Sequence, residues 1–182
     1  MRIVGLDLSL ASTGVAVIDE GAEVSVDRIA TKPSGDNLWH RAHRLQRITT
    51  IVLDTVHTGG TPDLVVIEGP SHGQARQGGQ HDRAGLWWLI VEALVAVEEI
   101  PVAEVPPATL KRYACGKGNA GKDEVLAAVV RRYPTVEVVG NDTADALTLA
   151  AMGADHLGHP IAAMPATHRA ALDKVAWPEL TP

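Results

Sequence analysis

Four acidic residues at three separate places in the chain have the types and spacing needed to bind a metal ion. Asp7 ends MRIVGLD and Glu68 ends LVVIE, whereas Asp142 and Asp145 lie in NDTADALTLA. The first two follow runs of Val, Ile and Leu typical of buried strands, where a carboxylate is costly unless a cation or hydrogen bonds compensate it. The other two are three residues apart in a predicted helix and therefore share one face. Clusters of carboxylate oxygens select Mg²⁺ or Mn²⁺, so the pattern predicts metal-assisted chemistry on phosphate.

Each acid also has a purely structural alternative. Asp7 would then accept hydrogen bonds from the turn amides that follow it, and Glu68, before Gly-Pro, would be a solvated strand end. Asp142 stands where a helix N-cap belongs, which would make Asp145 a first-turn acid that is favourable to the helix dipole. The presence of all four acids together favours the metal site.

The composition indicates one soluble globular domain. The chain has 182 residues, of which 46% are hydrophobic and 21% charged, and this length suffices for one well-packed core. No apolar run approaches the roughly 20 residues of a membrane span, and the N-terminus enters a strand pattern without the regions of a signal peptide. The single cysteine, Cys115, excludes an intrachain disulfide and argues against a structural zinc site. We therefore expect a cytoplasmic protein with no membrane contact.

The net charge of −6 argues against a broadly basic nucleic-acid-binding protein, but the basic residues are clustered. The clusters are Arg41, Arg44 and Arg47; Lys111, Arg112, Lys117 and Lys122; and Arg131 with Arg132. Solvated helix faces and phosphate contacts both explain such clusters. Since local charge decides DNA binding, the overall charge leaves both explanations open.

The predicted elements begin with strands and then alternate between helices and strands. Apolar runs and alternation predict strands at 2–9, 13–19, 23–31, 64–68 and 102–105. Apolar residues at helical spacing predict helices at 36–57, with Asp36 as N-cap, and at 83–99, 106–114, 122–133, 142–152 and 167–177, while 135–139 is predicted to be extended. A three-stranded meander followed by alternating elements predicts an α/β layer fold with a mixed sheet.

Four segments together resemble a known family. They are GLDLSLASTG, VVIEGP, TLKRYACGKGNAGKDEV and NDTADALTLA, in this order. The chain is similar to the RuvC Holliday junction resolvases of the RNase H-like nuclease superfamily, with a bacteriophage-type member as one possibility. The match runs from residue 2 to about residue 153, which suggests a nuclease domain at 1–156 and a tail with one short helix at 157–182. The resemblance implies an RNase H-like fold with a mixed five-stranded sheet, a three-stranded antiparallel meander plus parallel strands, flanked by helices.

The resemblance implies a Mg²⁺-dependent endonuclease that acts as a homodimer on four-way DNA junctions and cuts two strands symmetrically. Two ions would be held by Asp7, Glu68, Asp142 and Asp145, with Mn²⁺ able to substitute, and no nucleotide cofactor is expected. A two-ion site needs a bridging carboxylate. We expect Asp7 to bridge, Glu68 to hold one ion, and the two helix acids to complete the shell of the other.

Two lysines that matter in this family align with Lys111 and Lys122. Lys122 follows the break GNAG and is expected to contact the scissile phosphate or to counter its developing charge. Lys111 and Lys117 are predicted to hold neighbouring phosphates, with solvated surface as the alternative.

Two regions bear on the partners. Trp87 and Trp88 are adjacent, so on a helix their side chains point about 100° apart. One alternative is a core residue beside a partly covered surface residue. We predict instead that the two tryptophans belong to a dimer interface. The loop after Glu68 contains no aromatic residue, unlike better-known family members, and offers His72 and Arg76 as DNA contacts; a plain flexible loop is the alternative.

Three other functions remain as alternatives. A less selective branched-DNA or flap nuclease would follow from the missing aromatic residue. An actin-like ATPase or sugar kinase fragment would share the first phosphate loop but lacks the second phosphate motif within 182 residues. A non-catalytic DNA-binding module is disfavoured because all four acids are present.

Overall fold

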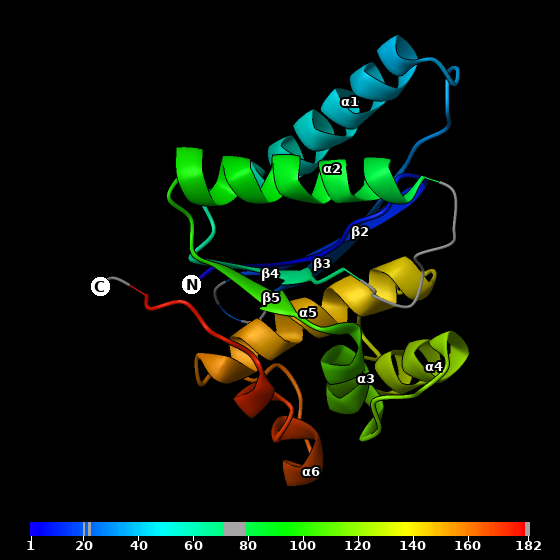
Figure 1. Cartoon of the computed structure of the whole chain (residues 1–182). Coiled ribbons are helices and arrows are strands. Elements are labelled where there is room, and N and C mark those ends of the chain that lie inside the picture. Colours follow the sequence, from blue (N-terminus) through cyan, green and yellow to red (C-terminus); the bar gives the residue numbers. More distant parts are fainter. Residues whose placement is uncertain (20, 22, 71–78, 181–182) are drawn as a thin grey trace.

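A mixed five-stranded sheet forms the centre of the protein, and helices cover both of its faces (Figure 1). The computed structural model describes residues 1–19, 21, 23–70 and 79–180. The strand order is β3-β2-β1-β4-β5. The first three strands pair antiparallel, and β4 and β5 add in parallel to β1. Their bounds are Ile3–Asp7 for β1, Ser12–Ile18 for β2, Val24–Ala30 for β3, Leu64–Glu68 for β4 and Val102–Val105 for β5. The predicted meander with parallel strands is confirmed.

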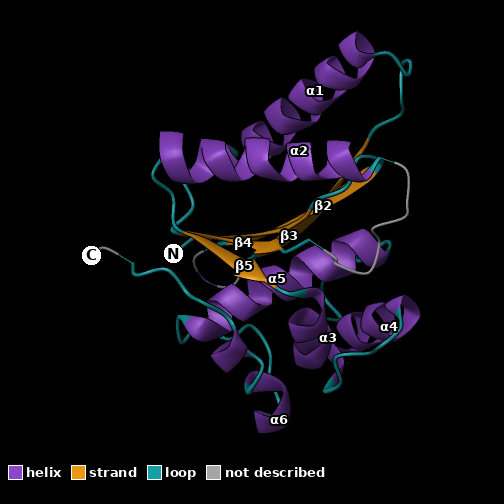
Figure 2. Cartoon of the chain, in the orientation of Figure 1, coloured by secondary structure: helices purple, strands orange, loops and turns teal. Residues whose placement is uncertain are grey.

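The helices form two layers, one on each face of the sheet (Figure 2). One layer holds α1 and α2, and the other holds α3, α4 and α5, with the short α6 below them (Figure 1). Their bounds are Leu38–His57 for α1, Gln80–Glu92 for α2, Pro107–Cys115 for α3, Lys122–Arg132 for α4, Asn141–His156 for α5 and Ala166–Arg169 for α6. Two other helical segments are η3, a π-helix at Ala93–Val97, and η4, a 3₁₀ helix at Leu172–Lys174. No helix in the described part of the chain is long and apolar enough to cross a membrane.

Alternation along the central strands divides the core into two clusters. Val4 and Leu6 of β1 pack with the apolar residues of α1 and α2, whereas Ile3 packs with those of α3, α4 and α5. Side chains in a strand point to opposite faces in turn. Because both faces are covered by helices, β1 and β4 are apolar on both sides, and each ends at its first acid.

Two glycines let α5 lie directly on the sheet. A Cβ atom at Gly5 would lie 2.1 Å from the carbonyl oxygen of Ala146, and one at Gly14 would lie 2.0 Å from the carbonyl oxygen of Asp142. Any larger residue at either position would push the helix away. The N-terminus of α5 is therefore held against β2 at the level where Gly14 pairs with Asp7.

Helix boundaries differ from the prediction on the α1–α2 side. The N-cap of α1 is Asn37 rather than Asp36, because the Asn37 Oδ1 atom accepts a hydrogen bond of 2.9 Å from the amide of His40. The second helix begins at Gln80, three residues before the predicted start, and continues into η3. Both neighbouring residues at the first boundary are good caps, so only the backbone geometry selects between them.

In the C-terminal third, one prediction is refined and one is wrong. Residues 135–139, predicted to be extended, begin with a turn and form no strand, and Val136 and Val138 pack against the core. Residues 167–177 contain α6 and η4 instead of one amphipathic helix. In this segment tertiary contacts override the local pattern: Arg169 lies 2.6 Å from buried Asp155, and Trp177 stacks on His156 with 4.1 Å between ring centroids.

Candidate active site

The four predicted acids meet at one edge of the sheet. Asp7 is the last residue of β1 and Glu68 is the last residue of β4, and these strands are parallel neighbours. The carboxyl ends of parallel strands lie at the same edge. Asp142 and Asp145 stand in the first two turns of α5, whose N-terminus reaches this edge over Gly14 (Figure 1).

Burial and mutual repulsion make the site costly to ionise. Burial, followed by the charges of Glu68, Asp145 and Asp142, raises the pKa of Asp7 well above its ordinary value. Burial and the Glu68 charge raise the pKa of Asp145 to about 7. Like charges held close together out of water cannot all remain ionised unless a cation joins them.

Glu68 is held among both acids and cations. Burial raises its pKa, while a hydrogen bond with Asp7 and the positive charges of Lys122 and Lys111 act in the opposite direction. The same two lysines favour the charged form of Asp145. The structure therefore brings Lys111 and Lys122 to the acidic cluster from α3 and from the first residue of α4.

The structural alternative for Asp142 is wrong. The N-cap of α5 is Gly140, and its amide donates to the hydroxyl of Thr143 at 3.1 Å, so Asp142 does not cap the helix. For Asp7, one of the turn amides is bonded elsewhere, because the amide of Ser9 donates to the hydroxyl of Thr13 at 3.1 Å. The Gly-x-x-Thr spacing at 140–143 was a sequence signal for the true cap.

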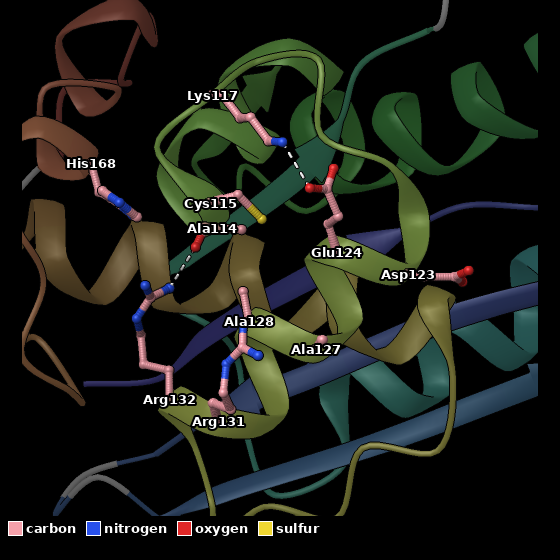
Figure 3. Close-up of a pocket in the computed structure, with 10 residues that line it drawn as sticks. All are labelled: Ala114, Cys115, Lys117, Asp123, Glu124, Ala127, Ala128, Arg131, Arg132 and His168. Carbon is pink, nitrogen blue, oxygen red and sulfur yellow. Dashed lines mark hydrogen bonds and ion pairs between the residues drawn. The ribbon is translucent and has the colours of Figure 1, made fainter.

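Lys117 lies apart from the cluster. Its Nζ atom lies 2.7 Å from Glu124 Oε1, and both side chains are half-exposed. Figure 3 shows this pair at the rim of a cavity of about 680 Å³ between α3 and α4, where Arg132 donates to the carbonyl oxygen of Ala114 at 2.9 Å. None of the four acids lines this cavity, and its charged groups are partly paired with each other, so it is not the reactive site.

The two tryptophans have different environments. Trp87 is partly buried and its indole N–H donates to the carbonyl oxygen of Glu68 at 3.0 Å, whereas Trp88 is 63% exposed. This support of Glu68 by Trp87 was missed, because no sequence spacing connects an indole with a carbonyl 19 residues earlier. His72 and Arg76, the predicted DNA contacts in the loop, lie outside the described residues.

The donor set fits a hard divalent cation in its chemistry. It offers several buried carboxylate oxygens whose burial and mutual repulsion are offset only in part by Lys111 and Lys122, which suits Mg²⁺ or Mn²⁺. Among the described residues, no three His, Cys, Asp or Glu side chains stand close enough together to coordinate one ion in their present rotamers. The carboxylates thus lie within electrostatic range of one another but are not arranged as a complete ligand set.

The fold and the site define a class of protein. A sheet in the order β3-β2-β1-β4-β5 with helices on both faces, and with acids at the ends of β1 and β4 and on α5, is the arrangement of the RNase H-like fold. Solved structures agree with this fold: Thermus thermophilus RuvC in complex with a Holliday junction substrate has a TM-score of 0.63 at 20% identity and covers 87% of this chain and 98% of that one. The yeast mitochondrial Holliday junction resolvase Ydc2 has a TM-score of 0.53 at 13% identity, covering 94% and 80%.

Sequence relatives then identify the family, although no family model matches the chain. The crossover junction endodeoxyribonuclease RuvC of Polynucleobacter asymbioticus is 30% identical over 86% of this chain and 90% of its own length. The RuvC of Hyphomonas neptunium is 32% identical over 86% and 92%. This chain belongs to the RuvC family of crossover junction endodeoxyribonucleases.

Proposed function

We propose that this protein is a divalent-metal-dependent endonuclease that resolves Holliday junctions in the cytoplasm by paired, symmetric cuts from a homodimer. The observation that carries the proposal is the cluster of buried acids at the ends of β1 and β4, whose raised pKa values reflect a need for added positive charge. The division into a nuclease domain at 1–156 and a tail at 157–182 is part of the same proposal.

The residues that would hold the metal are the four acids, with Asp7 between Glu68 and the pair on α5. When bound, two Mg²⁺ ions, or Mn²⁺ in their place, supply an activated water and stabilise the leaving 3′ oxygen. Glu68 shares a hydrogen bond with Asp7 and is under the influence of the positive charges of Lys122 and Lys111, so it is suited to orient the water. Its backbone is fixed by the Trp87 indole.

The lysines supply fixed positive charge for the DNA. Lys122 is the first residue of α4, where the helix dipole already favours an anion, and it is the proposed contact to the scissile phosphate. Lys111 would hold a neighbouring phosphate. Lys117 would do so only after leaving Glu124, which makes its contribution the smaller one. His72 and Arg76 remain proposed contacts from the loop after Glu68.

The homodimer is proposed to form through α2 and its continuation. The exposed apolar residues there are Trp88 at 63%, Leu89 at 45%, Val95 at 47% and Val97 at 69%. Adjacent exposed apolar residues indicate an interface, and a two-fold interface suits a two-fold substrate. Trp87 would support the interface from beneath through its edge-to-face contact with Trp88. In sedimentation experiments Trp88→Glu is expected to be monomeric, and a dimer that survives this change contradicts the assignment.

Cleavage of defined DNA substrates tests the function. The wild-type protein with Mg²⁺ is incubated with four-way, Y-shaped, flap and linear DNA, beside Asp7→Asn and beside Lys174→Ala as an exposed control on η4. Paired cuts in the four-way junction by the wild type and the control, but not by Asp7→Asn, are expected. Absence of cleavage on every branched substrate contradicts the proposal. Equal cleavage of all branched substrates supports the alternative, a less selective debranching nuclease.

A further inference from the structure

A cavity of about 470 Å³ beside the N-terminal half of α1 is lined by cationic and aromatic side chains. Its lining includes Lys32, Ser34, Trp39, His43, Arg44 and Arg47. Of the residues that the structure describes, no acid lines this cavity, and the first turn of α1 contains none either. The lining is thus cationic although the chain has a net charge of −6, and the acid nearest to it in sequence is Asp36, which precedes the N-cap Asn37.

Two of these cations are available to a ligand. Within the described ranges, neither Lys32 nor Arg47 takes part in an ion pair, and both residues are exposed. By contrast, Arg41 on the same helix is held by Asp82 of α2, with 2.8 Å between its Nε atom and Oδ2. Lys32 and Arg47 thus carry charges that no acid in the described part of the chain pairs with.

Trp39 forms a fixed aromatic platform at this cavity. Its side chain is 64% exposed, yet its ring lies 4.1 Å from the ring of His43 and 5.1 Å from that of His40, measured between centroids. His40 is itself fixed, because its Nδ1 atom lies 2.8 Å from Oδ1 of Asn37, the N-cap of α1. An exposed indole that is already ordered loses little entropy when a flat ligand stacks on it.

The cavity adjoins the turn that follows the first catalytic acid. Arg44 donates a hydrogen bond to the carbonyl oxygen of Leu10, three residues after Asp7, and the amide of Thr31 donates to the carbonyl oxygen of Ala11 at 2.9 Å. Lys111 and Lys122 approach the acids from the opposite face of the sheet, on α3 and α4 (Figure 1). Positive charge therefore stands on both sides of the acidic edge.

We propose that this cavity binds an unpaired nucleotide of the branched DNA substrate, with the base stacked on Trp39 and the adjoining phosphates on Lys32 and Arg47. A base exposes its face only where pairing or stacking is interrupted, as at a branch point or in a single strand, so intact duplex does not use the indole. This inference rests on the proposed function. It assigns to α1 the aromatic contact that the loop after Glu68 lacks in its sequence.

Binding measurements in a non-cleaving background test the inference. The full-length Asp7→Asn protein is titrated with Mg²⁺ present against fluorescent four-way junction, single strand and linear duplex. Trp39→Ala is expected to weaken binding to the junction and the single strand by roughly five- to hundredfold, the range for one stacked base, and to leave duplex binding within about twofold. Trp39→Phe is expected to restore most of the affinity. A 2-aminopurine at the branch point is expected to be quenched in the Trp39 protein and not in Trp39→Ala.

The two cations are tested through salt dependence. Lys32→Ala and Arg47→Ala are each expected to lower the slope of log K against log salt by about one, whereas Lys174→Ala, an exposed lysine on η4, leaves the slope unchanged. Unchanged junction binding by Trp39→Ala overturns the inference, as does an equal loss on duplex. Dissociation of the dimer by Trp39→Ala, seen in sedimentation, also overturns it, because the cavity would then be a protein interface. If wild type still cleaves junctions in any of these cases, the proposed function stands and only the assignment of this cavity fails.

Discussion

Two acids on the same helix show how this protein treats buried negative charge in two different ways. Asp155, near the end of α5, is 2% exposed, accepts a hydrogen bond from the Tyr113 hydroxyl at 3.0 Å, and has Arg169 at 2.6 Å as an ion-pair partner outside hydrogen-bond geometry. Asp145, ten residues earlier, lies among other acids, and its pKa is raised to about 7. The chain pairs the first acid with an arginine, whereas Lys122 and Lys111 offset the burial and repulsion of the second only in part. We take this difference as the sign of function.

Exchanging each acid for its amide gives the largest expected contrast. Asp145→Asn removes a proposed metal ligand and is expected to lower junction cleavage by roughly a thousandfold, because metal stabilisation is worth several kcal/mol and each 1.36 kcal/mol is tenfold. Asp155→Asn keeps a hydrogen-bonding partner for Tyr113 and is expected to cleave within a few-fold of wild type where it is folded. Single-turnover cleavage of a four-way junction measures both. Similar losses in the two variants would erase the distinction between the acids.

Removing the internal cation tests the other half of the comparison. Arg169→Ala leaves Asp155 buried without its ion-pair partner and is expected to lower the free energy of unfolding by about 1–3 kcal/mol, since Arg169 is itself half-exposed. Urea denaturation measures this change. Lys174→Ala, a nearby exposed residue, serves as the control. An unchanged free energy of unfolding in Arg169→Ala would mean that the ion pair with Arg169 does not stabilise the buried charge of Asp155.

The pH dependence of stability distinguishes an uncompensated acid directly. The folded-state pKa of Asp145 lies above the ordinary value of 3.8, so the folded protein binds the proton more tightly than the unfolded chain. Its contribution to stability is full below pH 3.8 and is lost as the pH rises through about 7, at up to about 1.4 kcal/mol per pH unit per proton. Asp145→Asn is therefore expected to flatten this decline and to make the metal-free protein more stable at pH 8. Urea titrations from pH 5 to 8 in EDTA follow it, with Asp173→Asn as an exposed control; parallel curves for all proteins would contradict the account.

The smallest expected effect concerns the support of the acidic edge by Trp87. Trp87→Phe loses the hydrogen bond to the carbonyl oxygen of Glu68 and keeps most of the packing, so it is expected to cost about 1 kcal/mol of stability. A few-fold loss of cleavage should accompany it if the bond helps to position Glu68. Trp177→Phe, which loses a similar bond to Leu172 in the tail, is the matched control and should lower stability without lowering cleavage. Equal cleavage losses in both variants would show a general packing effect.

The central strands could be predicted from their apolar runs, which Asp7 and Glu68 each follow, whereas Asp142 and Asp145 were indicated by their spacing in a predicted helix. Such a run predicts burial, and a carboxylate at its end predicts an edge site, as at Asp7 and Glu68. Helix caps were harder, since Asp36 and Asn37 are both good caps and only backbone geometry chooses. The cap of α5 at Gly140 was missed although the hydroxyl of Thr143, three residues later, accepts from its amide.

Long-range partners account for the remaining errors. Residues 135–139 were predicted to be extended, and Val136 and Val138 do pack against the core. They form no strand because a strand also needs the edge of a neighbouring strand for its hydrogen bonds, and none pairs with them in the described sheet. The pairing of Asp155 with Arg169 joins residues 14 apart through a turn and has no local pattern. The tail therefore could not be interpreted before its contacts were known.

The central claim is that the acids at the sheet edge bind a divalent cation, and calorimetric titration with Mn²⁺ tests it most directly. Measured at pH 7 in two buffers of different ionisation enthalpy, it reports affinity and the number of protons released. The wild type and Asp155→Asn are expected to bind Mn²⁺ with release of protons, because the pKa of Asp145 is about 7 and that of Asp7 is raised. Asp145→Asn should bind more weakly and release fewer. Equal affinity and equal proton release in all three proteins would contradict the claim.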